Sequence, residues 1–152
     1  IDTKRITSLR NKLLKYAPVV LFDQISYNQI IKVSGTNTFN DFKKIVLITG
    51  IAKPQFLYRQ VVKHHEVVKH YNFRDHYQYT SSDLKMFRDF IGSFAPGEIC
   101  VLTTEKDMVR MLHLFSDLDE VQIPLFYWEI GIQLNEYKST FDNLILNYAK
   151  KT

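Results

Sequence analysis

The order of apolar and polar residues predicts alternating strands and helices over most of the chain. The clearest strand is 44–49, where four apolar residues follow one another without alternation. Strands that are covered on both faces of a parallel sheet have this composition. Three further strands are expected, at 70–73, 99–103 and 124–130.

Apolar residues recur three and four positions apart in the segments between these strands, as on the buried face of a helix. Ser82 is expected to cap the helix that starts at Asp83, because a serine hydroxyl accepts a hydrogen bond from a free backbone N–H. Pro18 closes the first helix. The expected helices are 3–16, 55–70, 83–92, 106–115 and 136–150.

This alternation predicts an α/β fold: a Rossmann-like parallel sheet with helices on both faces, preceded by a hinge-like strand segment. The strand segment starts at 19–26, and Ser-Gly-Thr-Asn at 34–37 is the strongest turn signal in the chain. A hinge or subdomain boundary is therefore expected within 23–40. The expected domains are 1–40, a helix with linker strands, and 41–152, the α/β domain.

Composition places the chain among globular proteins, since 45% of its 152 residues are apolar and 24% are charged. No apolar run approaches the roughly 18 residues that cross a bilayer. Cys100 is the only cysteine, which excludes a disulfide framework and a cysteine metal cluster. The net charge of +4 favours phosphate-bearing partners or an anionic membrane surface. No arginine-rich run, zinc finger or aromatic RNA-binding signature points to nucleic acid.

The first segment that could carry chemistry is Thr-Gly-Ile-Ala-Lys-Pro at 49–54. Gly50, after a buried strand, lets the backbone come close to a ligand or a neighbouring loop. The following helix start offers free N–H groups to an anion, and Lys53 adds a positive charge there. The alternative is an ordinary strand-to-helix turn. The chain has no Gly-x-x-x-x-Gly-Lys-Ser/Thr phosphate loop.

The second segment places Asp75 and His76 at a strand exit. A histidine beside an aspartate can carry a proton or orient another carboxylate. The alternative is that Asp75 caps local backbone and His76 is merely exposed. The histidines at 64, 65 and 70 lack the spacing of a helical metal pair, so no metal site is expected.

The third segment is Thr-Thr-Glu-Lys-Asp at 103–107. Hydroxyls at a strand end followed by charges at a helix start are typical of an N-cap with acids in the first turn. The functional alternative adds a ligand-facing Thr104 or Lys106. All three segments follow strands of the expected parallel sheet, and working residues gather outside the carboxyl ends of such strands. Together they are expected to form half of a cleft.

In this order, Gly-Ile-Ala-x-Pro, Phe-x-Asp-His and Thr-Thr-Glu-Lys-Asp resemble the lipid A 4'-kinase (tetraacyldisaccharide 4'-kinase) family, over about residues 44–129. The chain looks like the C-terminal portion of such an enzyme. The resemblance implies a P-loop kinase that moves the γ-phosphoryl group of ATP, with Mg²⁺, to the 4'-hydroxyl of tetraacyldisaccharide 1-phosphate. It also implies work at the cytoplasmic face of the bacterial inner membrane, and contact with the membrane surface.

The half that would carry the phosphate loop, the metal-binding acids and the aspartate base is absent, so the resemblance implies that this chain is inactive alone. His76 is expected to orient that base, with Asp75 holding it. Other members often carry a second histidine where Tyr77 stands. The residues expected near nucleotide or substrate are Gly50, Lys53, Thr104, Lys106 and Asp107. The alternative is a Rossmann-like module that binds a nucleotide or sugar phosphate without catalysis.

Overall fold

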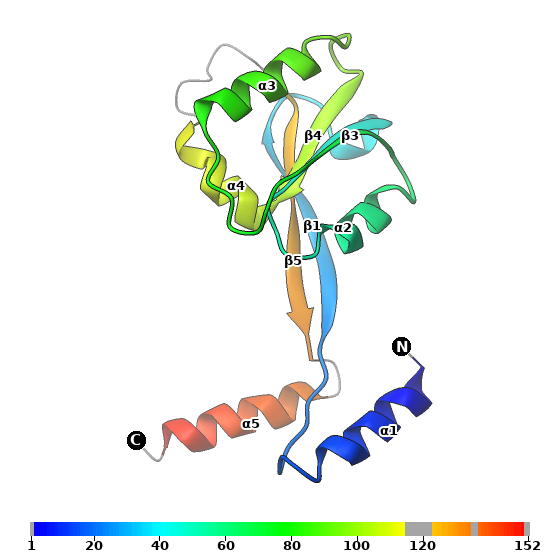
Figure 1. Ribbon diagram of the computed structural model, residues 1–152, viewed down its shortest axis with the longest axis vertical. Coiled ribbons are helices and arrows are strands. Elements are labelled where there is room, and N and C mark those ends of the chain that lie inside the picture. The colour runs from blue at the N-terminus through cyan, green and yellow to red at the C-terminus, as the bar shows by residue number, and fades with distance from the viewer. Residues whose placement is uncertain (1, 115–122, 135–136, 151–152) are drawn as a thin grey trace. The chain divides into compact units, whose positions relative to one another are not determined.

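The computed structural model describes residues 2–114, 123–134 and 137–150. Its helices and strands follow one another along the chain in the alternation expected from the sequence (Figure 1). They are α1 (Thr3–Leu13), β1 (Gln24–Ser34), η1 (Phe39–Asp41), β2 (Lys44–Thr49), α2 (Pro54–Val61), β3 (Glu66–Asn72), α3 (Ser81–Ile91), β4 (Ile99–Thr104), α4 (Glu105–Met111), η2 (Leu112–Leu114), β5 (Leu125–Gln133) and α5 (Lys138–Ala149).

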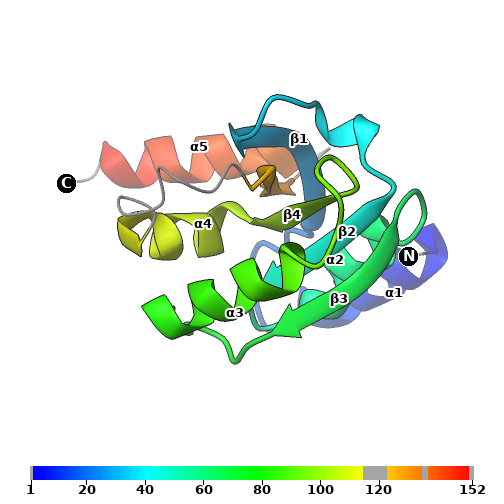
Figure 2. The ribbon, with the colours of Figure 1, turned by 90° about the horizontal axis from the view of Figure 1, so that it is seen from above.

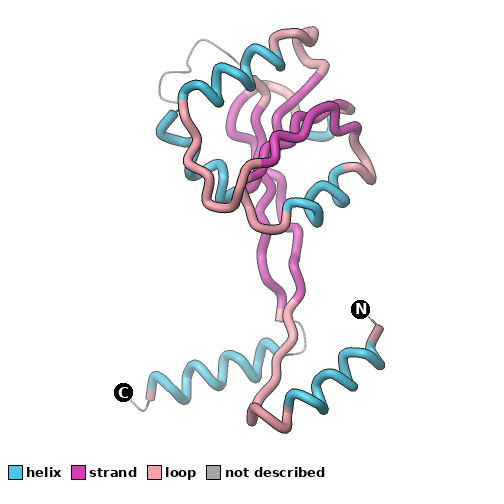
Figure 3. The backbone as a smooth tube through the Cα atoms, in the orientation of Figure 1, coloured by secondary structure: helices cyan, strands magenta, loops and turns pink. Residues whose placement is uncertain are grey.

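A single five-stranded sheet organises the described fold, in the order β1-β5-β4-β2-β3. The pairs β2–β3, β2–β4 and β4–β5 are parallel. At the edge, β1 lies beside β5 and runs in the opposite direction (Figures 1 and 3). The predicted Rossmann-like α/β fold is thus confirmed, with one strand that departs from the parallel arrangement.

The helices cover both faces of this sheet because β2 and β4 are apolar on both sides. Val46 and Ile48 of β2 pack in one buried cluster with residues of α3 and α4. Ile45 and Leu47 pack in a second cluster with residues of α2. In Figure 2, α3 and α4 lie side by side. Successive residues of β2 therefore point alternately into the two buried clusters, which explains why the strand is apolar without interruption.

The chain divides into two compact units, 27–130 and the combination of 1–26 with 131–152. Both boundaries fall inside strands, β1 and β5. In the second unit, the guanidinium of Arg10 lies 5.2 Å from the centre of the Tyr137 ring. The expected division into 1–40, a helix with linker strands, and 41–152, the α/β domain, stays a prediction. Within the described residues, no helix has the length and apolar character needed to traverse a membrane.

The helix predicted for 55–70 is wrong in its second half. α2 ends at Val61, and the N–H groups of His64 and His65 donate back to the Val61 carbonyl at 3.2 and 3.1 Å. The chain then enters β3, which pairs with β2 along its whole length. The β-branched and aromatic residues of Glu-Val-Val-Lys-His-Tyr suit a strand, and the partner strand decides between the two patterns.

Several predicted boundaries also move. The strand expected from residue 19 begins only at Gln24. Thr80, and not Ser82, caps α3: its side chain accepts from the Asp83 N–H, and the Asp83 carboxylate accepts from the Thr80 N–H at 2.8 Å. This reciprocal capping box satisfies two free N–H groups, whereas a lone serine cap satisfies one. The predicted helix limits at Phe115 and Glu136 lie outside the described residues.

His70 should make stability depend on pH. Its Nε2 lies 2.8 Å from Thr49 Oγ1, and its ring stacks on Tyr58. Burial lowers its pKa from the ordinary value near 6.5. The unfolded chain therefore takes up the proton first, so this contribution is full above about pH 6.5 and is lost as the pH falls toward the folded-state pKa. The free energy of unfolding, measured with urea, should fall less between pH 8 and pH 5 in His70→Gln than in the wild type. An equal fall in both proteins would contradict this.

Candidate functional site

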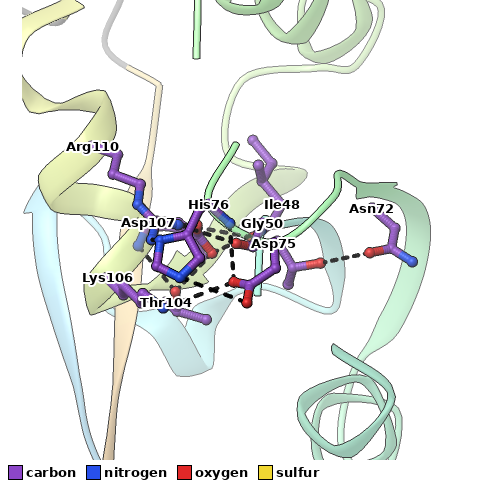
Figure 4. Close-up of polar contacts among 11 residues, drawn as sticks. Ile48, Gly50, Asn72, Asp75, His76, Thr104, Lys106, Asp107 and Arg110 are labelled. Atoms are coloured by element: carbon purple, nitrogen blue, oxygen red, sulfur yellow. Dashed lines mark hydrogen bonds and ion pairs between the residues drawn. The ribbon is translucent and has the colours of Figure 1, made fainter. Parts of the chain in front are cut away.

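The three loops predicted to carry chemistry meet at the carboxyl edge of β2, β3 and β4. The Phe73 N–H donates to the Thr49 carbonyl at 2.7 Å, and the His76 N–H donates to the Gly50 carbonyl at 3.2 Å. The Gly50 N–H in turn donates to the Asp107 carboxylate at 2.9 Å. Figure 4 shows the side chains of the three segments gathered around Gly50. The expected convergence at one sheet edge is confirmed.

Asp107 is the centre of this cluster and is fully buried. Its Oδ2 accepts from the Gly50 N–H and, at 2.8 Å, from the Thr104 hydroxyl. The same hydroxyl accepts from the Asp107 N–H and so caps α4. Oδ1 accepts from Arg110 at 3.2 Å. A buried carboxylate is tolerated only with such partners, so Thr104 and Asp107 hold two loops in place.

Three aromatic rings pack together in the loop that carries Asp75 and His76. The rings of Phe73 and Tyr77 stack with centroids 4.3 Å apart, and Tyr79 meets Tyr77 edge-on at 5.2 Å. Burial and then the negative charge of Asp107 raise the pKa of the buried Tyr79 hydroxyl. No hydrogen bond of ordinary geometry to that hydroxyl is found among the described residues. These rings pack against the core cluster that contains residues of α3 and α4.

Asp75 and His76 lie at the outer side of the cluster. The His76 side chain is 70% exposed, and its backbone has a φ of 58°. Asp75 Oδ1 accepts from the His76 N–H at 3.0 Å, and Oδ2 lies 3.8 Å from His76 Nε2. Lys106 Nζ is 3.8 Å from Asp75 Oδ1. Asp75 thus both caps local backbone and lies beside the imidazole, which combines the two sequence-based interpretations. Left-handed backbone at a non-glycine residue persists where its surroundings hold it.

Arg110 belongs to this cluster, and the sequence analysis missed it. Its Nη1 donates to the Gly50 carbonyl at 3.1 Å and to Asp107, and its Nη2 lies 3.1 Å from His76 Nδ1. The side chain is only 15% exposed. The available signal was spacing, because a residue three positions after Asp107 on a helix lies on the same face.

Lys53 is not drawn into the cluster. It is the N-cap residue of α2, makes no side-chain capping bond, and is exposed. No hydrogen bond or ion pair joins its side chain to the cluster among the residues that the structure covers. No side chain therefore caps the start of α2, where Pro54 lacks an N–H and the Phe56 N–H donates to the Lys53 carbonyl at 3.4 Å.

The described residues contain no preformed cluster of metal-binding side chains. None of them form a group of three or more histidine, cysteine, aspartate or glutamate side chains that could hold a metal ion. Both oxygens of Asp107 already accept hydrogen bonds inside the protein. Cys100 is buried in β4, and burial raises the pKa of its thiol to about 12, which leaves it a poor ligand and nucleophile.

A methyl group at Gly50 should disturb the cluster directly. A Cβ at this position would lie 3.0 Å from Asp107 Oδ1, 3.1 Å from the Tyr79 hydroxyl and 3.3 Å from Tyr77 Cβ. Gly50→Ala should therefore lower the free energy of unfolding by about 1–3 kcal/mol, as overpacking does. Urea denaturation measures this. Gly92→Ala is the control, because Gly92 has an ordinary φ of −63° and a Cβ there would meet only the backbone oxygens of Arg88 and Asp89, at 3.2 and 3.8 Å. An equal loss of stability in Gly50→Ala and Gly92→Ala would contradict the argument.

These features define a class of protein: an α/β domain whose strand-end loops present an imidazole and basic side chains on one edge of the sheet. The sequence matches the tetraacyldisaccharide-1-P 4'-kinase family over residues 4–150. The chain belongs to this family, which confirms the resemblance found from the three motifs.

Three proteins named tetraacyldisaccharide 4'-kinase illustrate the similarity. The protein of Bacteroides fragilis (strain YCH46) is 30% identical over 112 residues, which cover 72% of this chain and 29% of the relative. That of Phocaeicola vulgatus is 30% identical over 112 residues, covering 72% and 30%. That of Cytophaga hutchinsonii is 32% identical over 119 residues, covering 78% and 32%. The matched part of the chain thus spans about three-tenths of each of these relatives. No solved structure matches the chain.

Proposed function

We propose that this chain is the C-terminal part of a lipid A biosynthesis kinase and is inactive without a P-loop half. The complete enzyme would transfer the γ-phosphoryl group of ATP to the 4'-hydroxyl of tetraacyldisaccharide 1-phosphate. The observation that carries the proposal is the convergence of Gly50, Asp75, His76 and Asp107 at one sheet edge. Family membership and the names of the relatives support it.

In this proposal the cluster forms one wall of the active-site cleft. His76, with its ring exposed, orients or polarises the carboxylate base that the other half supplies. Asp75 holds the His76 backbone and lies beside its ring. Lys106 and Lys53 add exposed positive charge near the phosphates, while Thr104, Asp107 and Gly50 keep the loops together. Positioning and electrostatic stabilisation dominate phosphoryl transfer.

ATP and Mg²⁺ belong to the complete enzyme in this proposal, and their principal ligands belong to the P-loop half. Mg²⁺ neutralises charge on the transferred phosphate. In this proposal the complete enzyme acts at the cytoplasmic face of the bacterial inner membrane. The net charge of +4 suits contact with an anionic membrane surface.

The test is a fusion of this chain to the remaining part of the Bacteroides fragilis relative, outside the 29% that this chain matches. Transfer of ³²P from γ-labelled ATP to tetraacyldisaccharide 1-phosphate is measured for the fusion, for the parent relative and for this chain alone. Transfer by the fusion and parent, and none by the chain, is expected. A folded fusion that binds Mg-ATP as tightly as the parent but transfers no phosphate contradicts the proposal.

A second candidate is a non-catalytic module that binds a nucleotide or sugar phosphate. The start of α2, which no side chain caps, favours it, because the positive dipole end of a helix beside an exposed lysine attracts anions. Calorimetry of the isolated chain with Mg-ATP separates the candidates. Tight binding favours the module, whereas weak or absent binding suits a kinase part that needs its other half.

A further inference from the structure

The guanidinium of Arg110 is fixed in place before it reaches His76. Its Nη1 donates both to Asp107 Oδ1 at 3.2 Å and to the Gly50 carbonyl at 3.1 Å. The carboxylate is fully buried, and the arginine side chain is 15% exposed. A planar group that is held at two points on one nitrogen has little freedom to turn, so the direction of Nη2 is set by the buried cluster.

Nη2 of Arg110 lies 3.1 Å from Nδ1 of His76. Arginine has only donors and keeps its charge in proteins. A hydrogen bond between these atoms therefore requires an unprotonated Nδ1 that accepts. In a neutral imidazole the hydrogen is then on Nε2, the nitrogen that lies 3.8 Å from Asp75 Oδ2.

We propose that Arg110 is a positioning residue that holds the His76 ring in the Nε2–H tautomer and fixes the direction of that N–H. The catalytic consequence rests on the proposed function, whereas the tautomer does not. The His76 ring is 70% exposed, so packing alone leaves it free to turn. The backbone contacts of His76 fix its Cα. Of the two side chains beside the ring, Arg110 lies at hydrogen-bond distance, 3.1 Å from Nδ1, whereas Asp75 Oδ2 lies 3.8 Å from Nε2.

The hydrogen bond is tested by nitrogen NMR of this chain, labelled with ¹⁵N at histidine and arginine. At a pH where His76 is neutral, its Nδ1 should have the chemical shift of an unprotonated acceptor and show scalar coupling to Nη2 of Arg110. Arg110→Lys keeps the positive charge but removes the planar guanidinium group. In this variant the coupling should disappear, and the His76 ring should show a mixture of both tautomers. Arg59→Lys, on the exposed side of α2, is the control and should leave the His76 signals unchanged.

A protonated Nδ1 in the neutral wild-type ring would overturn the proposal, and so would His76 signals that Arg110→Lys leaves unchanged. The wild-type measurement decides the matter even if an Arg110 variant fails to fold. It needs no kinase activity, so failure of this inference and failure of the proposed function are distinguishable.

A double-mutant cycle in the complete kinase tests the consequence for catalysis. Arg110→Lys should lower kcat about tenfold or more with little change in KM for ATP, within the coupling range of residues in contact. In a His76→Ala background the same change should cost less than about threefold, because its target is gone. Equal fold-losses in both backgrounds would indicate a purely structural role and would overturn the positioning role.

Discussion

Replacing Asp107 by alanine should lower the free energy of unfolding by about 3–5 kcal/mol, the range seen when one partner of a buried ion pair is removed. The carboxylate is fully buried and accepts hydrogen bonds from Gly50, Thr104 and Arg110. Its removal leaves a buried backbone N–H, a buried hydroxyl and a mostly buried guanidinium without their acceptor. Urea denaturation followed by circular dichroism measures the loss.

Asp89→Ala is the matched control, because Asp89 is a helical aspartate in an exposed ion pair with Lys85. Exposed pairs of this kind contribute about 0–1 kcal/mol. If Asp107→Ala costs no more than Asp89→Ala, the carboxylate does not hold the loops together. Asp107 would then not be the group that organises the cluster.

Replacing His76 by alanine should lower the turnover of the complete kinase by about 10²–10⁴-fold, the usual contribution of a group that acts in proton transfer. The affinity for ATP should change far less, because in the proposed function His76 faces the base and not the nucleotide. Steady-state kinetics with nucleotide titration separate the two quantities. Unchanged turnover would remove the catalytic assignment of His76.

Measurements of stability on the variants should test whether the loss of turnover is caused by unfolding. The His76 side chain is exposed and the residue has a left-handed φ of 58°. This conformation costs an ordinary residue about 1–2 kcal/mol and costs glycine little. His76→Gly should therefore be at least as stable as His76→Ala while both lose turnover. His64→Ala, in an exposed turn after α2, should keep turnover and is the control for the histidine substitution itself.

Most of the architecture followed from local patterns. Buried strands such as β2 and β4 are recognisable because uninterrupted apolar residues are needed where both faces are covered. The second half of the 55–70 segment was misassigned because its apolar spacing fits a helix as well as a strand. The choice was made by hydrogen bonds to β2, a partner that lies elsewhere in the sequence. The cap of α3 was misplaced for a smaller reason: Thr80, Ser81 and Ser82 are all competent caps, and only Asp83 identifies the one in use.

The sequence predicted which loops meet at the candidate site but not the hydrogen bonds and ion pairs within it. Gly50, His76 and Asp107 were expected at one edge because carboxyl ends of parallel strands share an edge. The central place of Asp107 was not expected, since an acid in a first helical turn is usually exposed. The spacing of Arg110 from Asp107 placed both on one face of α4, but the sequence gives no sign that the arginine also reaches a histidine 34 residues earlier.

The sequence by itself determined the family, the alternation of strands and helices, and the set of loops that meet, because these depend on residue types and their order. Only the tertiary structure decided which atoms pair: the burial of Asp107, the anchoring of Arg110 and the nitrogen of His76 that it faces. Such pairings depend on distances between segments brought together by folding, to within a few tenths of an ångström, and residue order does not specify distances of that kind.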